Sequence, residues 1–307
     1  MPNASPRSPG AAAILAILSL IPRPASGDEP KSDVVIRTAI DAILANDRLI
    51  QDGTVRTTTT VTDRSVTKPE TIRSETDGGL VAALSRAPET RTAESVTFRG
   101  GDVLARIEGR DGSCDQLFLR RGDTWKVYTR SMNRVQIVDR EGLPDRIPVD
   151  PREIGSGSIR SSLIDRLNAP DVAEAAMVES AGARIGRVVR IVKTDNGVES
   201  RTIYEFSPED RFLLRRAIST VDGRVVSILD LNYQDVLDGR AKFLKSSSLK
   251  FYAPKSPLEA LAPETWHQEV RVDVEELTLN QDVDDEAFDD LSLPKDVEVF
   301  DSSADRP

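Results

Sequence analysis

The feature that most constrains this chain is a series of short segments rich in β-branched residues and separated by turn-forming glycines. Thr54–Val66 reads TVRTTTTVTDRSV, and such residues favour the pleated, half-buried surface of a strand. Hairpin turns that need a positive φ are expected at Gly100–Asp102, Asp195–Gly197 and Asp222–Gly223. The pattern predicts a mainly β (α+β) protein of about a dozen largely antiparallel strands. The other strands expected are Arg91–Arg99, Val103–Gly109, Gln116–Arg121, Arg134–Asp139, Arg184–Lys193, Val198–Phe206, Phe212–Thr220, Arg224–Asn232, Arg240–Tyr252 and Trp266–Leu279.

Three segments have the character of helices. Ile36–Leu44 carries apolar residues at i, i+3 and i+4 spacing, which predicts a short amphipathic helix. After the Pro- and Gly-rich loop Leu143–Arg160, Ser161–Asn168 and Asp171–Ser180 are expected to form two short helices. A large antiparallel sheet must hide its apolar face by curling, stacking or being covered. The predicted fold is therefore a curved antiparallel sheet, or unclosed β-barrel, with helices covering its concave side.

Residues 1–27 are expected to be a cleaved signal peptide. Ala11–Ile21 is an apolar run of the right length, and Ala25–Gly27 offers small residues at a cleavage site. No run approaches the roughly 20 apolar residues that a membrane span needs, and no cysteine follows the apolar run as a lipid anchor would require. We expect a soluble protein exported to the bacterial periplasm or cell envelope. Residues 28–301 would form one domain with a helix-loop insert near 143–180, and residues 302–307 a disordered tail.

Charge and cysteine content narrow the functional classes. The net charge of −10 repels phosphate backbones, and no basic stripe offsets it, so nucleic-acid binding is not expected. Cys114 is the only cysteine, so no disulfide can form within the chain. It could form an intermolecular disulfide or a redox site, but we expect it to act as a small buried hydrophobe.

The residues that enzymes use most are poorly placed. His267 is the only histidine, and alternation puts it on the charged face of its strand with Glu269 and Arg271. Ser247–Lys250 matches S-x-x-K, but the accompanying S-D-N and K-T-G motifs are absent. The chain is therefore not expected to be an enzyme, although its 51 acidic residues leave carboxylate pairs open.

The acidic run Asp282–Glu286 invites a calcium interpretation. An EF-hand loop starting at Asp282 would place Gly at 287 and Glu at 293, where this chain has Ala287 and Leu293. A solvated turn is the expectation, and no metal or other cofactor is expected.

Two segments resemble the bacterial lipoprotein-carrier-like (LolA/LolB-type) exported proteins. Tyr204–Glu209, followed by the strand Arg211–Ile218, is similar to their mid-chain hairpin. Leu277–Asp301 is similar to their C-terminal pattern, whose residues here are Asn280, Phe288, Pro294, and Val299 or Phe300 before Asp301. Lys295 departs from the family's usual glycine. The resemblance implies an unclosed β-barrel whose helices cover an apolar cavity, and it bears on fold more than on function.

Two functions remain open at this point. The first is an exported protein that binds or carries a lipid-like or apolar ligand. Its expected lining residues are Trp266, Val270, Val272 and Val274, unless these simply fill a solid core. The second is a structural or protein-interaction module of the cell envelope with no small ligand.

Alternation along the last long strand makes opposite predictions for two adjacent residues. Trp266 should be buried on the face of the three valines, and His267 should be exposed. The phase should slip at Glu275–Glu276 through a β-bulge, because Leu277 carries the apolar pattern on odd numbers. In urea melts, Trp266→Ala should cost about 3–5 kcal/mol and His267→Ala less than about 0.5 kcal/mol. A larger loss for His267→Ala would refute this strand register and the case against catalysis.

Overall fold

A computed structural model describes most of the chain downstream of the expected leader. The described residues are 32–65, 70–75, 81–86, 88–109, 112–122, 124–139, 162–180, 182–194, 196–252, 266–288, 293 and 296–301. The expected signal peptide, the tail and the whole of the 143–160 loop lie outside them. The domain limits predicted from the sequence therefore stay predictions.

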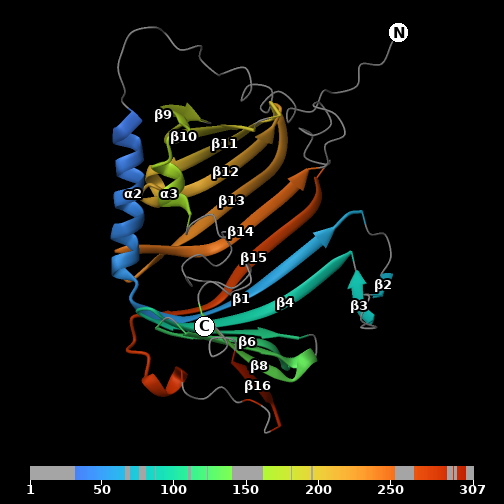
Figure 1. Ribbon diagram of the computed structural model, residues 1–307. Helices are drawn as coiled ribbons and strands as arrows, with labels where there is room; N and C mark the ends of the chain where they lie inside the picture. Colours follow the sequence, from blue (N-terminus) through green and yellow to red (C-terminus); the bar gives the residue numbers. More distant parts are fainter. Residues whose placement is uncertain are drawn as a thin grey trace, which may run out of the picture.

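Sixteen strands form two sheets in the described residues (Figure 1). The large sheet has 14 strands in the order β16-β8-β7-β6-β5-β4-β1-β15-β14-β13-β12-β11-β10-β9, and β2 pairs with β3 separately. The strands are β1 Asp52–Asp63, β2 Glu70–Glu75, β3 Val81–Arg86, β4 Glu89–Arg99, β5 Asp102–Glu108, β6 Cys114–Arg121, β7 Thr124–Thr129, β8 Arg134–Asp139, β9 Val172–Ser180, β10 Ala183–Lys193, β11 Glu199–Ser207, β12 Leu213–Val221, β13 Arg224–Val236, β14 Ala241–Tyr252, β15 Trp266–Leu279 and β16 Glu298–Asp301.

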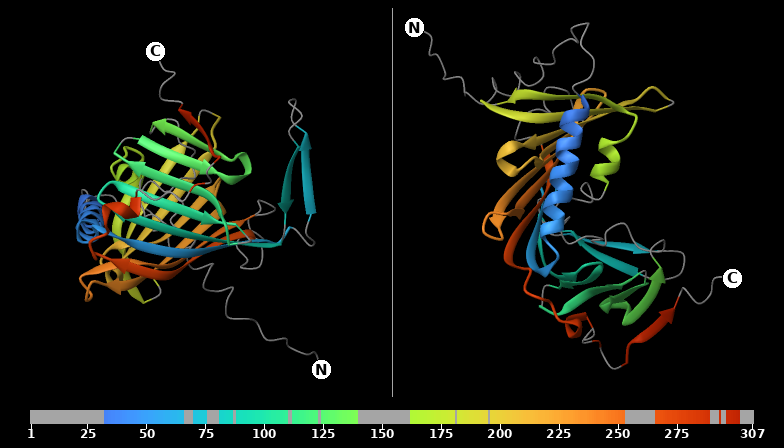
Figure 2. Two further views of the ribbon diagram at one scale, coloured as in Figure 1. Left: turned by 90° about the horizontal axis from the view of Figure 1, so that it is seen from below. Right: turned by 90° about the vertical axis from the view of Figure 1, so that its left-hand side faces the viewer.

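The large sheet is curved and does not close. Its end strands are β9 and β16, and the right-hand view of Figure 2 shows the sheet bent into a C. All neighbours pair antiparallel except β16 and β8, which are parallel. Hairpins build each half, and the Asp222-Gly223 turn has positive φ at both residues (49° and 74°), as a type I′ turn requires. The predicted fold class, a curved and unclosed antiparallel sheet with covering helices, is confirmed.

The face of the sheet that carries the main hydrophobic cluster is called here the inner face. Helix α2 (Ser32–Leu49) packs against β9, β10, β12 and β14, and helix α3 (Leu163–Leu167) lies in the opening of the C (Figure 2). Both helices contribute buried residues to the main cluster, among them Val35, Ala39 and Leu163. A Cβ at Gly186 of β10 would lie 3.1 Å from the Val35 side chain, so the helix approaches the strand as closely as glycine permits. Within the described residues, no helix is long and apolar enough to cross a membrane.

Two asparagine side chains fasten the helix to the sheet. Buried Asn46 of α2 donates to the Lys242 carbonyl (3.0 Å) and accepts from the Lys242 N–H (2.8 Å). Asn280, just beyond β15, donates to the Leu49 carbonyl (2.7 Å) and accepts from the Gln51 N–H (3.0 Å). Each amide supplies both a donor and an acceptor, so it satisfies backbone groups where the chain leaves regular structure.

One helix predicted from the sequence is wrong, and two small features were not predicted. Asp171–Ser180 is not a helix: Val172–Ser180 forms the edge strand β9, which pairs with β10. The helix expected at Ser161–Asn168 is present as α3. The β2–β3 hairpin and the four-residue strand β16 were not expected from the sequence.

The C-terminal segment covers the other face of β5–β8, called here the outer face. Phe288 ends the 3-10 helix Asp285–Phe288 and is fully buried. It packs into an outer cluster together with Val283, Leu293 and Val297 of the same segment, and with Leu104, Leu117, Leu119, Tyr128 and Val135 of the sheet. Phe288, one residue of the C-terminal pattern noted in the sequence, therefore has a packing role.

We expect Phe288→Ala to lower the free energy of unfolding by about 3–5 kcal/mol, because it empties a buried aromatic site. The matched control is Phe300→Ala in β16, whose side chain is 43% exposed and whose loss should cost less than about 0.5 kcal/mol. Urea melts followed by circular dichroism measure both changes. Equal losses would contradict the assigned role of the segment 283–297.

Candidate functional site

A row of half-buried apolar side chains crosses three central strands, β1, β15 and β14, on the inner face. Val61 of β1 pairs with Val270 of β15, and Val270 pairs with Leu249 of β14. All three are half-buried, whereas Leu229, the next member of the row, is fully buried in the main cluster. Cross-strand partners project from the same face of a sheet, so these residues form one continuous apolar strip.

The four lining residues predicted from the sequence do not share one surface. Val272 is buried in the main cluster, Val274 packs against that cluster, and half-buried Val270 lies beside them. Trp266 instead pairs with Tyr252, while Gln268 pairs with Phe251. His267 is therefore an extra residue in the strand, and this bulge turns Trp266 to the outer face.

The surroundings of Trp266 agree with that correction. Trp266 is 9% exposed, as predicted, but it packs with Tyr252 and Val225 in a separate small cluster. The Arg64 guanidinium carbon lies 3.6 Å from the centroid of its ring. His267 is exposed, also as predicted.

The phase slip expected at Glu275–Glu276 is confirmed. Arg56 of β1 pairs with Glu276 and the next residue, Thr57, pairs with Val274, so Glu275 is left over as a bulge. Val274 and Leu277, on either side of the bulge, both pack against the main cluster.

One acidic side chain lies on this apolar face. Glu94 of β4 pairs with Thr57 on one side and with Ile107 of β5 on the other. The following inward residues of β4, Val96 and Phe98, are buried in the main cluster. Glu94 accepts no hydrogen bond and forms no ion pair with any described residue, and burial raises the pKa of its carboxyl to about 7.

Thr57 adds a second unsatisfied polar group. Its side chain is 1% exposed, and its Oγ1 atom is buried without a hydrogen-bond partner. A buried hydroxyl that makes no hydrogen bond destabilises the fold by about 1–3 kcal/mol. Glu94 and Thr57, called here the polar pair, thus stand at facing positions on adjacent strands of the inner face.

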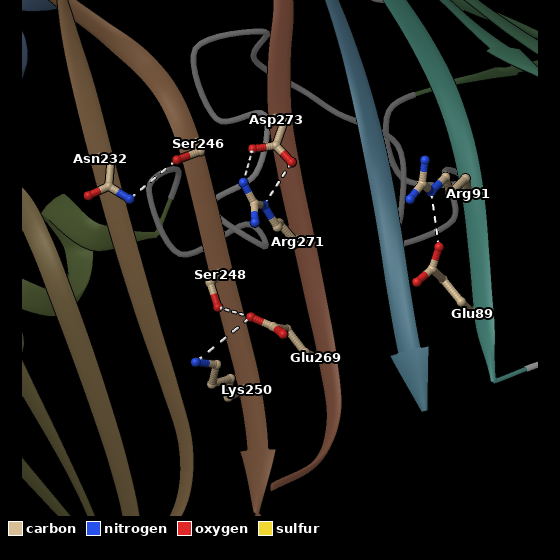
Figure 3. A network of polar contacts seen from close by, with 9 residues as sticks. All are labelled: Glu89, Arg91, Asn232, Ser246, Ser248, Lys250, Glu269, Arg271 and Asp273. Atoms are coloured by element: carbon tan, nitrogen blue, oxygen red, sulfur yellow. Dashed lines mark hydrogen bonds and ion pairs between the residues drawn. The ribbon is translucent and has the colours of Figure 1, made fainter. Parts of the chain in front are cut away.

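The outer face of the central strands differs sharply, because its polar groups are paired (Figure 3). Ser248 donates to Glu269 (2.6 Å), and Lys250 lies 3.9 Å from the same carboxylate. Arg271 donates two hydrogen bonds to Asp273 (2.8 and 2.9 Å). Such satisfied charges suit a surface that faces water.

The other residues singled out in the sequence make packing or ion-pair contacts and do not come together as a site. Ser247 is buried on the inner face, whereas Lys250 lies on the outer face, so the S-x-x-K residues do not converge. Half-buried Cys114 packs against the outer cluster, and burial raises the pKa of its thiol. Asp285 of the acidic run accepts hydrogen bonds from Arg99 and Arg121, and the Arg99 bond holds the pKa of Asp285 below its usual value.

Sequence reasoning missed the polar pair, although a signal was present. Even-numbered residues of β4 form its inward face, ending in Val96 and Phe98. Glu94 is also even-numbered, so it is a charged residue on the inward, apolar face of the strand. Such a residue carries a desolvation cost that a surface residue does not.

We expect the burial of Glu94 to make stability fall as pH rises. The carboxyl ionises near 4.5 in the unfolded chain and near 7 in the folded one, so between these values only the unfolded chain releases the proton. Glu94→Gln should therefore stabilise the protein by about 1–3 kcal/mol at pH 8 and hardly at all at pH 4. Urea melts at both pH values measure this, with exposed Glu276→Gln as the control. An equal gain for the two variants at pH 8 would contradict the burial of Glu94.

Similarity to known proteins is confined to solved structures. No family model matches the chain, and no curated protein matches it. Among solved structures, an outer-membrane lipoprotein-sorting domain from Vibrio parahaemolyticus is similar at a TM-score of 0.47 and 11% identity, covering 84% of this chain and 97% of that one. A DUF1329 family protein from Desulfovibrio piger is similar at a TM-score of 0.47 and 14% identity, covering 87% of this chain and 100% of that one. A LolA superfamily protein from Nitrosomonas europaea is similar at a TM-score of 0.43 and 11% identity, covering 82% of this chain and 97% of that one.

Proposed function

We propose that this chain is an exported protein of the bacterial cell envelope that binds a lipid-like or otherwise apolar ligand on the inner face of its sheet. The observation that carries the proposal is the half-buried apolar strip of Val61, Leu249 and Val270 on the central strands of a curved, unclosed sheet. Apolar side chains left partly uncovered on a concave surface are typical of ligand sites.

The contrast between the two faces supports the choice of surface. The outer face of β13–β15 carries paired charges and hydroxyls, which a hydrocarbon chain would have to desolvate. On the inner face, Val270, Val272 and Val274 would line the site, continuous with the strip. Trp266 has no part in it, because it lies on the outer face.

An interaction module without a small ligand is the alternative, and it has one observation in its favour. Strand β9 ends the large sheet and pairs only with β10 among the described strands, so its free edge could accept a strand from a partner. Its exposed residues include Glu174 and Glu179, and charges on an edge strand oppose such pairing. The inner face is therefore the better supported site.

Two adjacent residues of β1 allow a matched test of the inner face. Val61 projects inward and Thr60 outward, where Thr60 pairs with Arg271. Val61→Asp places a carboxylate in the strip and should weaken binding of the neutral fluorophore N-phenyl-1-naphthylamine roughly tenfold or more. Thr60→Asp adds the same charge on the other face and should change binding by less than about twofold.

Fluorescence titration measures both affinities, and native mass spectrometry of the protein purified from an envelope extract looks for a bound lipid. Absence of fluorophore binding together with absence of any bound lipid would refute the proposed function. Equal weakening by the two variants would show that the ligand does not bind on the inner face.

A further inference from the structure

We propose that the polar pair Glu94 and Thr57 holds the head group of the ligand, and that the site selects a cationic amphiphile, namely an apolar chain that ends in an amine. The inference rests on the proposed function and specifies the ligand class of the same inner-face site.

Position is the first support. Glu94 faces Thr57 across β4 and β1, and Thr57 faces Val274 across β1 and β15. Two residues further along β1, Thr59 pairs with Val272, and two beyond that, Val61 pairs with Val270. The polar pair therefore lies two inward positions, or four residues, from Val61 and Val270, which is about 13 Å along the strands. A ligand whose chain extends from the strip along the strands over this distance would have its head group at the pair.

The unsatisfied hydrogen-bonding capacity of the pair is the second support. The Thr57 hydroxyl is 1% exposed and has no partner, and Glu94 accepts no hydrogen bond from the described residues. Buried polar groups are almost always hydrogen-bonded, so the buried Thr57 hydroxyl, facing the half-buried Glu94 carboxyl, indicates a missing partner. The ligand would supply it.

The chemistry of that partner follows from the acceptors available. An ionised carboxylate only accepts hydrogen bonds, and a hydroxyl oxygen also accepts, whereas an ammonium group has three donors and no acceptor. An amine head can thus donate to both Glu94 and Thr57 and neutralise the carboxylate. A carboxylate head group would instead place two like charges side by side.

Among the described residues, no inner-face neighbour of Glu94 carries a charge that could pair with its carboxylate. The inner-face positions around it are Thr92 and Val96 on its own strand, Thr59 and Val55 on β1, and Ala105 and Ile107 on β5, none of which titrates. The nearby charged residues Arg56 and Glu108 pair with each other on the outer face (3.5 Å). Binding of an amine should therefore strengthen as Glu94 ionises, that is, as pH rises through about 7.

Three amphiphiles with the same C12 chain isolate the head group. Dodecylamine, dodecanol and dodecanoate, below their micelle concentrations and in 150 mM salt, would each displace N-phenyl-1-naphthylamine from the whole protein. At pH 8 dodecylamine should bind about tenfold tighter than dodecanol, the size expected for a hydrogen bond to a charged group, and dodecanoate should be the weakest. At pH 5.5 the advantage of the amine over the alcohol should largely vanish.

Variants of Glu94 and Thr57 test whether the preference for the amine depends on the polar pair. Glu94→Gln should remove the advantage of the amine at pH 8, and Thr57→Val should reduce it about threefold. Glu276→Gln removes one negative charge on the exposed surface and should leave the advantage intact, which excludes a general attraction of cations to an acidic protein. Thermal melts check that each variant remains folded.

The outcomes separate this inference from the proposed function. Displacement by none of the three amphiphiles would overturn both. Displacement without a preference for the amine, or a preference that survives in Glu94→Gln, would overturn the head-group assignment alone and leave an apolar-ligand site in place.

Discussion

The antiparallel pairing of β1 with β15 is the contact on which the rest of the fold depends. Strands β4–β8 extend the sheet from β1, and strands β9–β14 extend it from β15. Without this pairing the chain would have two smaller sheets and no continuous inner face. The bulge at Glu275 keeps the valines of β15 and the later Leu277 on the same side. The apolar strip exists because this register holds.

The sequence was informative about β15 only where the apolar pattern itself changed. Leu277 and Leu279 carry apolar character on odd numbers after valines on even ones, so the bulge at Glu275 could be predicted. The bulge at His267 left no such mark, because Trp266 and the valines have the same parity. Because Trp266 and the valines are all even-numbered, alternation predicted that they share one face. Trp266 pairs with Tyr252, however, and this pairing places it on the opposite face. A large apolar residue fits either face, so alternation alone could not distinguish them.

Strand β9 and Glu94 show two different limits. The sequence of β9, VAEAAMVES, is rich in helix formers and follows a proline suited to a helix start. Tertiary pairing with β10 overrides that local preference, which no single-segment argument detects. Glu94 could be recognised from the sequence as a charged residue on the same face of its strand as apolar Val96 and Phe98. Its importance depends on Thr57, which lies 37 positions earlier in the chain and becomes its neighbour only through strand pairing.

The β1–β15 ladder also has a consequence for the order in which the molecule assembles. Its partners are separated by more than 200 positions, from Gly53 with Leu279 to Asp63 with Gln268, whereas most other neighbours in the sheet are successive hairpins. Local hairpins close quickly, and contacts distant in sequence close late. A nascent chain, or one threaded from its amino end, could form both halves early but could not join them until residues 266–279 had emerged. Until then the inner faces of both halves would stand open to water, and this interval would be the stage most vulnerable to aggregation and most in need of a chaperone.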